Sequence, residues 1–235
     1  MLLTAFIHKK QAMTKQEFIN RVLLIMNEAS MADPTGNMFI GADTAKVEIQ
    51  IEKLYPASWR RCVGVMPKSW FDNKSFANSQ KVVDAPNGIG DIVLPDDFLV
   101  MTSFKMAKWK MPCLVAQEES PILIAMQSNE YTRGTEHRPV CLLRHKSIPA
   151  RIGDEIVYQD KKVLSYYSLP KTSHPSTHVV EHALYIPNVT EMPGTIPDDD
   201  NIIDPLAYMC ASTVFNSFEK YDAAKSMEIK ITEMI

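Results

Sequence analysis

The chain lacks the signatures of the commonest membrane and secreted proteins. None of its apolar runs approaches the ~20 residues that a helix needs to cross a bilayer. The apolar start, residues 1–7, is followed rather than preceded by basic residues, which is the reverse of a secretory signal peptide. No CxxC pair occurs among Cys62, Cys113, Cys141 and Cys210, so we expect reduced core thiols in a protein assembled in the cytosol.

Motifs for catalysis and nucleotide binding are also missing. The chain contains no GxSxG, HExxH, GxGxxG or P-loop pattern. It has no basic excess either, because 25 lysines and arginines stand against 28 carboxylates, a net charge of −3. A domain that binds nucleic acid usually carries a clustered basic patch. A mildly acidic surface would still suit a wall past which DNA slides without sticking.

The size and balance of the chain are those of an ordinary globular protein. It has 235 residues, of which 46% are hydrophobic and 23% charged. This length fits one large domain or a core with one insertion. Folding can bury roughly 70% of the unfolded chain's surface, so neither a disulfide nor a structural metal is required.

Helical patterns begin near the start of the chain. Thr14 and Glu17 form a capping box before an apolar stripe, which predicts a helix over 14–30. The next segment, 43–66, is ambiguous, because its first residues alternate like a strand whereas its apolar residues keep a helical step throughout. The length of the segment favours a helix that Pro56 bends or interrupts.

The last stretch of the chain predicts two further helices. Asp204-Pro205 supplies an N-cap residue and a proline at the first helical position, and the helix that follows is apolar or small nearly all round. An amphipathic helix after Asp222 continues to the last residue. Packing within the chain is the simpler explanation of its apolar stripe, and a partner subunit is the more specific one. The residues that we expect at such a subunit or ring interface are Met227, Ile231, Met234 and Ile235.

The middle of the chain has a different character. Short β-like runs are separated there by proline, glycine and asparagine, which suggests an antiparallel sheet or small sandwich. Between 155–159 and 163–169 we expect a hairpin that turns at Asp160-Lys161. The other expected strands lie within 81–83, 92–99, 100–109, 111–116, 122–126, 140–144 and 179–186.

These patterns predict an α+β fold. The N- and C-terminal helices, within 14–80 and 203–235, would pack as a helical core. Residues 81–197 would form an inserted antiparallel, sandwich-like β-rich domain, and 198–202 an acidic connector. The connector lacks the ligand spacing of a calcium-binding loop, so we expect it to be solvated.

Three histidines are the most tempting site for chemistry. His174, His178 and His182 would share one face of a helix, and two of them could then bind one zinc ion. Pro175 and the β-branched pair that follows His178 disfavour a helix, and on a strand residues four apart are ~13 Å apart. We therefore expect no metal and no cofactor, and keep a metal-dependent hydrolase that uses these histidines as the alternative function.

Three stretches carry a resemblance to a known family. They are residues 18–23 through 54–62, ending near Trp70-Phe71; Leu94-Pro95-Asp96-Asp97-Phe98-Leu99; and residues 204–211 with the trailing helix. Together they cover about half of the chain. In order and spacing they resemble the head–tail adaptor proteins of tailed bacteriophages. They resemble especially the tail tubular protein A type of short-tailed phages and the related ring proteins below the portal of crAss-like phages.

The resemblance implies a structural virion protein rather than an enzyme. Such proteins form a homo-oligomeric ring, commonly of twelve subunits, between the portal protein and the tail or other ring proteins, and double-stranded DNA passes through the channel without specific binding. The chain would be assembled in the host cytoplasm, sit at the head–tail junction of the virion, and have no membrane partner. A ring of identical head-to-tail contacts closes only if the rotation per subunit is fixed. A tail-completion or stopper protein at the same junction is an alternative that the sequence does not separate.

Overall fold

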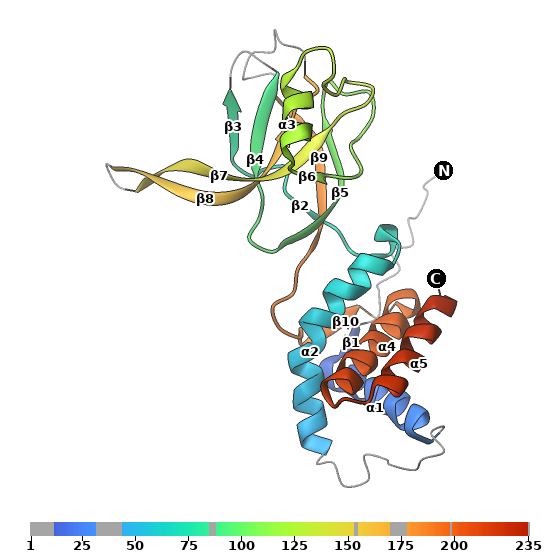
Figure 1. Ribbon diagram of the computed structural model, residues 1–235. Helices are drawn as coiled ribbons and strands as arrows, with labels where there is room; N and C mark the ends of the chain where they lie inside the picture. Colours follow the sequence, from blue (N-terminus) through green and yellow to red (C-terminus); the bar gives the residue numbers. More distant parts are fainter. Residues whose placement is uncertain are drawn as a thin grey trace, which may run out of the picture. The chain divides into compact units, whose positions relative to one another are not determined.

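The computed structural model describes residues 12–31, 44–84, 88–152, 155–169, 178–197 and 199–234, which form two compact units (Figure 1). The fold is α+β, as expected. The helical unit consists of the described residues up to Phe71 and from Asn188 onward, and the β unit runs from Asp72 to Pro187. The two boundaries, after Phe71 and after Pro187, lie earlier in the chain than the expected boundaries after residues 80 and 197. The reason is that Phe76 already belongs to the β core and Ile196 belongs to a strand of the helical unit.

The helical unit is built from both ends of the chain. A short 3₁₀ turn, η1 (Lys68–Trp70), follows its second helix, and its two short strands pair antiparallel with each other. The strands are β1 (Ala12–Thr14) and β10 (Thr195–Pro197); the helices are α1 (Lys15–Met31), α2 (Thr44–Val65), α4 (Asp200–Ser217) and α5 (Tyr221–Met234).

The start of α1 confirms the predicted capping box. The backbone N–H of Thr14 donates to Glu17 Oε2 at 2.7 Å, its hydroxyl donates to the same oxygen at 2.8 Å, and the Glu17 N–H donates to Thr14 Oγ1 at 3.2 Å. The two bonds from Thr14 lower the pKa of the Glu17 carboxyl, because they favour its charged form. Two of the unpaired donors at a helix N-terminus are thereby satisfied.

The ambiguous second segment is a helix. Val47 and Ile51 are buried, whereas Ile49 is 55% exposed. A strand would have placed all three side chains on one face, so the burial follows the helical step and not the alternation. Pro56 lies inside the helix and is buried, and the helix continues past it to Val65. Packing of the apolar stripe against the other helices therefore outweighs the hydrogen bond that proline removes.

The predicted start of the first C-terminal helix is wrong. α4 begins at Asp200, and its N-cap is Asp199, whose carboxylate accepts the N–H of Asn201 at 3.1 Å. The acidic stretch is therefore partly a helix cap rather than only a connector, and Pro205 lies inside the helix. Beginning earlier allows the helix to bury Ile202 and Ile203. The carbonyl that loses its donor to Pro205 belongs to Asn201, which is exposed and can be hydrated.

The helix α5 is amphipathic, as predicted, and a polar network joins it to two other helices. Glu228 accepts from Arg61 of α2 at 2.8 Å and from Ser212 of α4 at 3.1 Å. The bond from Arg61 is the main reason why the pKa of Glu228 is lowered. In the turn before α5, Glu219 has a φ of 60°, a conformation in which glycine is the usual residue.

The β unit contains two sheets. One has the order β2-β9-β5 and is antiparallel; the other has the order β3-β4-β8-β7-β6, in which only β6 and β7 are parallel. One core cluster takes residues from both sheets and is rich in aromatic rings, including Phe76, Phe104 and Tyr166. The strands are β2 (Lys74–Ser75), β3 (Lys81–Asp84), β4 (Ile89–Val93), β5 (Phe98–Met106), β6 (Gln117–Glu118), β7 (Cys141–Ile152), β8 (Glu155–Tyr166) and β9 (Val180–Pro187).

Two strand predictions and one turn prediction in this unit are wrong, and a turn at Asp96-Asp97 divides the expected strand 92–99 between β4 and β5. Residues 122–126 lie in the helix α3 (Pro121–Ser128), because the Ser120 side chain caps it by accepting the N–H of Leu123 at 3.2 Å. Residues 111–116 form no strand, and only Cys113 makes a bridge, to Phe104. Asp160-Lys161 is not a turn, because β8 runs through it and pairs with β7 over its whole length.

Candidate interaction surface

The histidine cluster is only partly described, and its described members bond to protein groups. His174 lies outside the described residues. His178 is buried, and its Nδ1 is 2.9 Å from the hydroxyl of Tyr166; burial lowers its pKa, and two nearby lysines add to the effect. His182 of β9 has its Nε2 2.7 Å from the Oγ of Ser103 on the neighbouring strand β5 of the same sheet. In the part of the chain that the structure describes, no three histidine, cysteine or acidic side chains are placed to hold a metal ion.

The four cysteines are buried free thiols, as the sequence predicts. Burial raises the pKa of Cys62 and of Cys210 to about 12. Cys141 lies close enough to Cys113 to donate a hydrogen bond, which lowers the pKa of Cys113, whereas burial raises that of Cys141. Reactive cysteines are generally exposed thiolates, so Cys62, Cys141 and Cys210 have the character of structural residues.

The stripe of α5 that we expected at an interface is covered mainly by its own chain. Met227 and Ile231 are only 2% and 4% exposed and pack within the helical unit. Met234 is 39% exposed, so of the described members it alone keeps surface for a partner. Ile235 lies outside the described residues. The simpler explanation of the stripe, packing within the chain, accounts for Met227 and Ile231.

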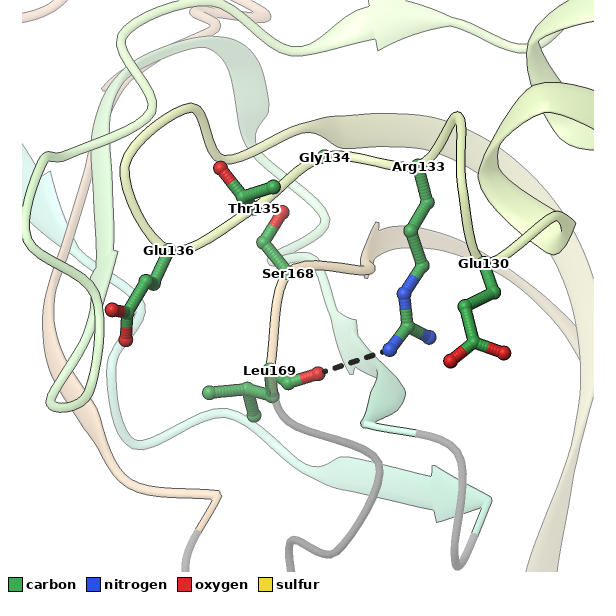
Figure 2. A pocket seen from close by; sticks show the side chains of 7 residues that line it. All are labelled: Glu130, Arg133, Gly134, Thr135, Glu136, Ser168 and Leu169. Carbon is green, nitrogen blue, oxygen red and sulfur yellow. Dashed lines mark hydrogen bonds between the residues drawn. The ribbon is translucent and has the colours of Figure 1, made fainter.

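A pocket of about 290 Å³ opens beside the loop that follows α3 (Figure 2). Arg133 donates to the carbonyl of Leu169 at 3.5 Å on one side of it. Ser168, which precedes Leu169 in the chain, accepts the N–H of Val140 with its Oγ at 3.1 Å. A side chain at Gly134 would come within 2.6 Å of that same oxygen. These groups hold the loop together, and among the residues lining the pocket no nucleophile is paired with a base.

The most unusual feature of the β unit is a two-stranded ribbon. β7 and β8 pair along their whole length, from the pair Cys141 and Tyr166 to the pair Ile152 and Glu155. By contrast, β4 pairs with β8 only over residues 163–166, and β6 pairs with β7 only at residues 142–143. Beyond those points no other described strand pairs with either, and the ribbon projects past the rest of the sheet (Figure 1). We call this projection, residues 144–162, the arm. A two-stranded ribbon is marginally stable alone, so the arm needs support at its base or from a partner.

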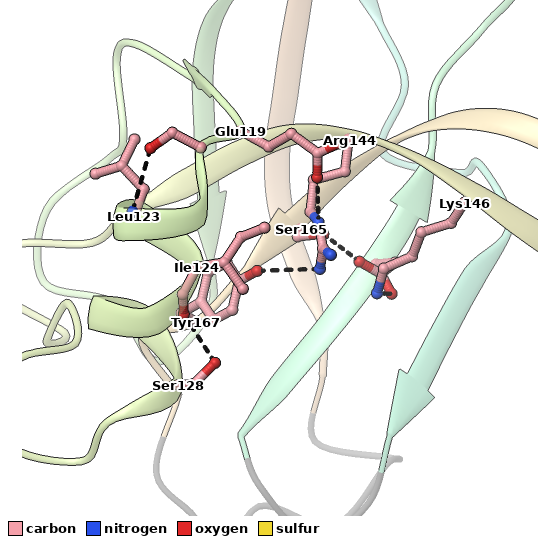
Figure 3. A network of polar contacts seen from close by, with 10 residues as sticks. Glu119, Leu123, Ile124, Ser128, Arg144, Lys146, Ser165 and Tyr167 are labelled. Carbon is pink, nitrogen blue, oxygen red and sulfur yellow. Dashed lines mark hydrogen bonds and ion pairs between the residues drawn. The ribbon is translucent and has the colours of Figure 1, made fainter.

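A polar network fixes the base of the arm (Figure 3). The carboxylate of Asp91 in β4 is only 2% exposed, accepts from Lys146 of β7 at 2.6 Å, and also accepts the hydroxyl of Ser165 in β8. Beside it, Arg144 donates to Glu119 at 2.9 Å. Since the donors and acceptors come from β4, β7, β8 and the residue after β6, the network sets the direction in which the arm leaves the sheet.

Exposed apolar side chains of the β unit are concentrated in two places. In its described part nine large hydrophobic side chains are exposed, and only Val179 lies outside both places. Two belong to the arm: Val157, 39% exposed, and Tyr158, 69% exposed. The other six lie within residues 111–131, which we call the apolar segment: Met111, Leu114, Val115, Ile122, Met126 and Tyr131. Clustered exposed apolar residues commonly mark contact surfaces.

The arm and the apolar segment also differ in charge. The arm contains five lysines and arginines against three carboxylates, whereas the apolar segment contains three carboxylates and no lysine or arginine. Among the cations of the arm whose side chains are described, Arg144 pairs with Glu119 and Lys146 with Asp91, Lys161 lies 3.9 Å from the exposed Asp96, and Lys162 lies over the ring of Phe98; all four are partly exposed. The exposed carboxylates of the segment include Glu118.

Sequence reasoning missed both surfaces. The arm was hidden by the hairpin expected at Asp160-Lys161. The signal that could have found it is Gly153-Asp154, a two-residue Gly-Asp step between strand-like runs, which is typical of tight hairpins. The apolar segment does not follow from the sequence, because the pattern over 122–126 predicts a strand where the structure has the helix α3.

Comparison with known proteins adds no family: no protein-family model and no curated protein sequence matches the chain. Across the described residues, no helix is both long and apolar enough to span a bilayer. The two surfaces and the histidine and cysteine environments are therefore the basis for any statement of function.

Proposed function

We propose that the chain is a structural subunit of the head–tail junction of a tailed bacteriophage. Copies of it form a homo-oligomeric ring between the portal protein and the tail or other ring proteins, and DNA passes through the ring's channel. The observation that carries the proposal is the arm, a ribbon that leaves its sheet, pairs with no other described strand beyond that point, and exposes Val157 and Tyr158. Unpaired N–H and C=O groups at a strand's outer edge are ready to pair with another chain.

The division of the chain supports the same proposal. The helical unit joins segments from both ends of the chain into one buried core, which is suited to setting a fixed angle between subunits. The β unit supplies the projecting arm and the apolar segment, which are suited to contacts. A fixed rotation per subunit is the condition under which a head-to-tail chain of identical contacts closes into a ring. A tail-completion or stopper role at the same junction differs from this one only in the order of its partners.

The metal-dependent hydrolase receives no support from the described residues. His178 bonds to Tyr166 and His182 bonds to Ser103, so each already has a protein partner. Metal analysis of the purified chain and of its His178→Ala variant distinguishes the two functions. Stoichiometric metal in the parent and none in the variant would favour the hydrolase.

Electron microscopy of the purified chain tests the ring. We expect particles with a central hole and a single rotational symmetry, which become more frequent as the protein concentration rises. Images that contain only monomers at every concentration, or only compact two-fold dimers, would contradict the proposal.

A further inference from the structure

The ring leaves open which surfaces of the subunit meet, and the β unit offers two that match. We propose that the arm of one copy docks on the apolar segment of the next copy, so that Tyr158 packs against Ile122 and Met126 of α3. This inference rests on the proposed ring, and it names the contact that would build it.

The first support is the distribution of exposed apolar side chains. Eight of the nine in the described part of the β unit belong either to the arm or to the apolar segment. A contact between the two surfaces would therefore be an interface with exposed apolar side chains on both sides. Tyrosine and methionine are both enriched in such interfaces.

The second support is charge complementarity. The apolar segment carries carboxylates and no cation, and the arm carries an excess of cations. Lys162 shares the face of β8 that carries Tyr158 and lies four residues nearer the base of the arm, so a copy that covers this face can bring Glu118 or a neighbouring carboxylate toward Lys162. Opposite charges at the edge of an apolar contact favour this orientation over a contact between two arms, in which cations would meet cations.

The third support is reach. Tyr158 lies four residues beyond Lys162, the last residue of β8 that bonds to the β4 side of the sheet, and four residues of a strand span about 13 Å. The intact β7–β8 ladder therefore holds Tyr158 away from the base of its own arm, where Arg144 meets Glu119 beside α3. A projecting element and its receptor at different places on one subunit form a heterologous contact, which generates a ring or an open filament rather than a closed dimer.

Cross-linking between two singly substituted full-length chains tests the contact. One population carries Tyr158→Cys, the other carries Ile122→Cys with a tag that changes its mass, and a bismaleimide with a flexible spacer joins cysteines that lie close together. The native thiols at positions 62, 113, 141 and 210 are buried and serve as a low background. Val179→Cys is the matched control, because Val179 is exposed at 50% but belongs to neither surface.

We expect a cross-linked heterodimer from the mixture of Tyr158→Cys and Ile122→Cys, several-fold in excess of the product from either population alone or from any mixture with Val179→Cys. Efficient linking of Tyr158→Cys to itself would show that arms meet arms and would overturn the proposal. So would the absence of the mixed product at concentrations of up to about 100 µM, which detect even weak association.

A second variant separates this contact from the ring itself. Ile122→Asp would place a carboxylate in the docked interface, and we expect it to weaken association at least about tenfold because a buried charge without a partner is costly. If rings form in the parent but Ile122→Asp and Tyr158→Asp leave them intact, the result supports the proposed ring and contradicts the proposed arm contact. If the mixed cross-link forms but only open, unclosed assemblies are seen, the result supports the arm contact and contradicts the proposed ring.

Discussion

The carboxylate of Asp91 should determine how firmly the arm is held. Asp91 is only 2% exposed. Its carboxylate lies 2.6 Å from the ammonium of Lys146 and accepts a hydrogen bond from the Ser165 hydroxyl. Asp91→Asn keeps the shape and one acceptor oxygen but removes the charge. The bond to Lys146 then changes from an ion pair to a weaker contact between an amide and an ammonium group.

The expected loss follows from the exposure of each partner. Breaking a fully buried ion pair costs about 3–5 kcal/mol, and a hydrogen bond to a charged group contributes about 1.5–3 kcal/mol. The side chain of Lys146 is 27% exposed, so water can compensate its ammonium in part. We therefore expect Asp91→Asn to lower the free energy of opening the arm by about 2 kcal/mol, which corresponds to a loss of roughly thirtyfold in amide protection.

Hydrogen exchange read by mass spectrometry measures this in the intact chain, segment by segment. Peptides from the arm and from β4 should lose protection, whereas peptides from α2 and α4 should not change. A double-mutant cycle with Lys146→Met should give a coupling of about 1–2 kcal/mol. The matched control is Asp96→Asn, whose carboxylate is 96% exposed and 3.9 Å from Lys161, and which should have almost no effect. A coupling below about 0.5 kcal/mol, or equal losses in both units, would refute the reasoning.

Three further predictions concern single residues. Glu219→Gly should stabilise the helical unit by about 0.5–1 kcal/mol, measured by exchange of α4 and α5 amides, because Glu219 has a φ of 60°; no gain would contradict this. Gly134→Ala should destabilise the loop after α3 by about 1–3 kcal/mol, since the new Cβ would lie 2.6 Å from Ser168 Oγ, and unchanged protection of that loop would contradict it. Burial lowers the pKa of His178, so the unfolded chain binds its proton first as the pH falls. The β unit should therefore lose stability below about pH 6.5, and His178→Gln should flatten the dependence of β-unit exchange on pH; a parallel profile would refute it.

Much of the helical unit follows from local sequence signals. The capping box is sufficient to predict the start of α1, and the helical step is sufficient to predict that α2 is a helix, because both signals depend on neighbouring residues and on one apolar stripe. The start of α4 was mistaken because Asp204-Pro205 has the form of a helix start but lies inside the helix. The burial of Ile203 at 0% exposure, a tertiary effect, decided that boundary.

The β unit shows the limit of the same signals. Ser120-Pro121 begins a helix, yet the apolar residues after it also fit a strand, and the pattern alone does not separate the two. The arm depends on which strands pair beyond residue 144. The sequence of a single strand does not indicate which distant strand will pair with it. The polar contact between Asp91 and Lys146 joins residues 55 positions apart and was invisible for the same reason.

Native mass spectrometry of the purified full-length chain, over a range of concentrations, tests the central claim most directly. A ring built by head-to-tail contacts predicts one closed stoichiometry, close to twelve copies, that replaces the monomer as concentration rises and is not followed by larger species. A chain that remains monomeric throughout, or that stops at the dimer, would contradict it.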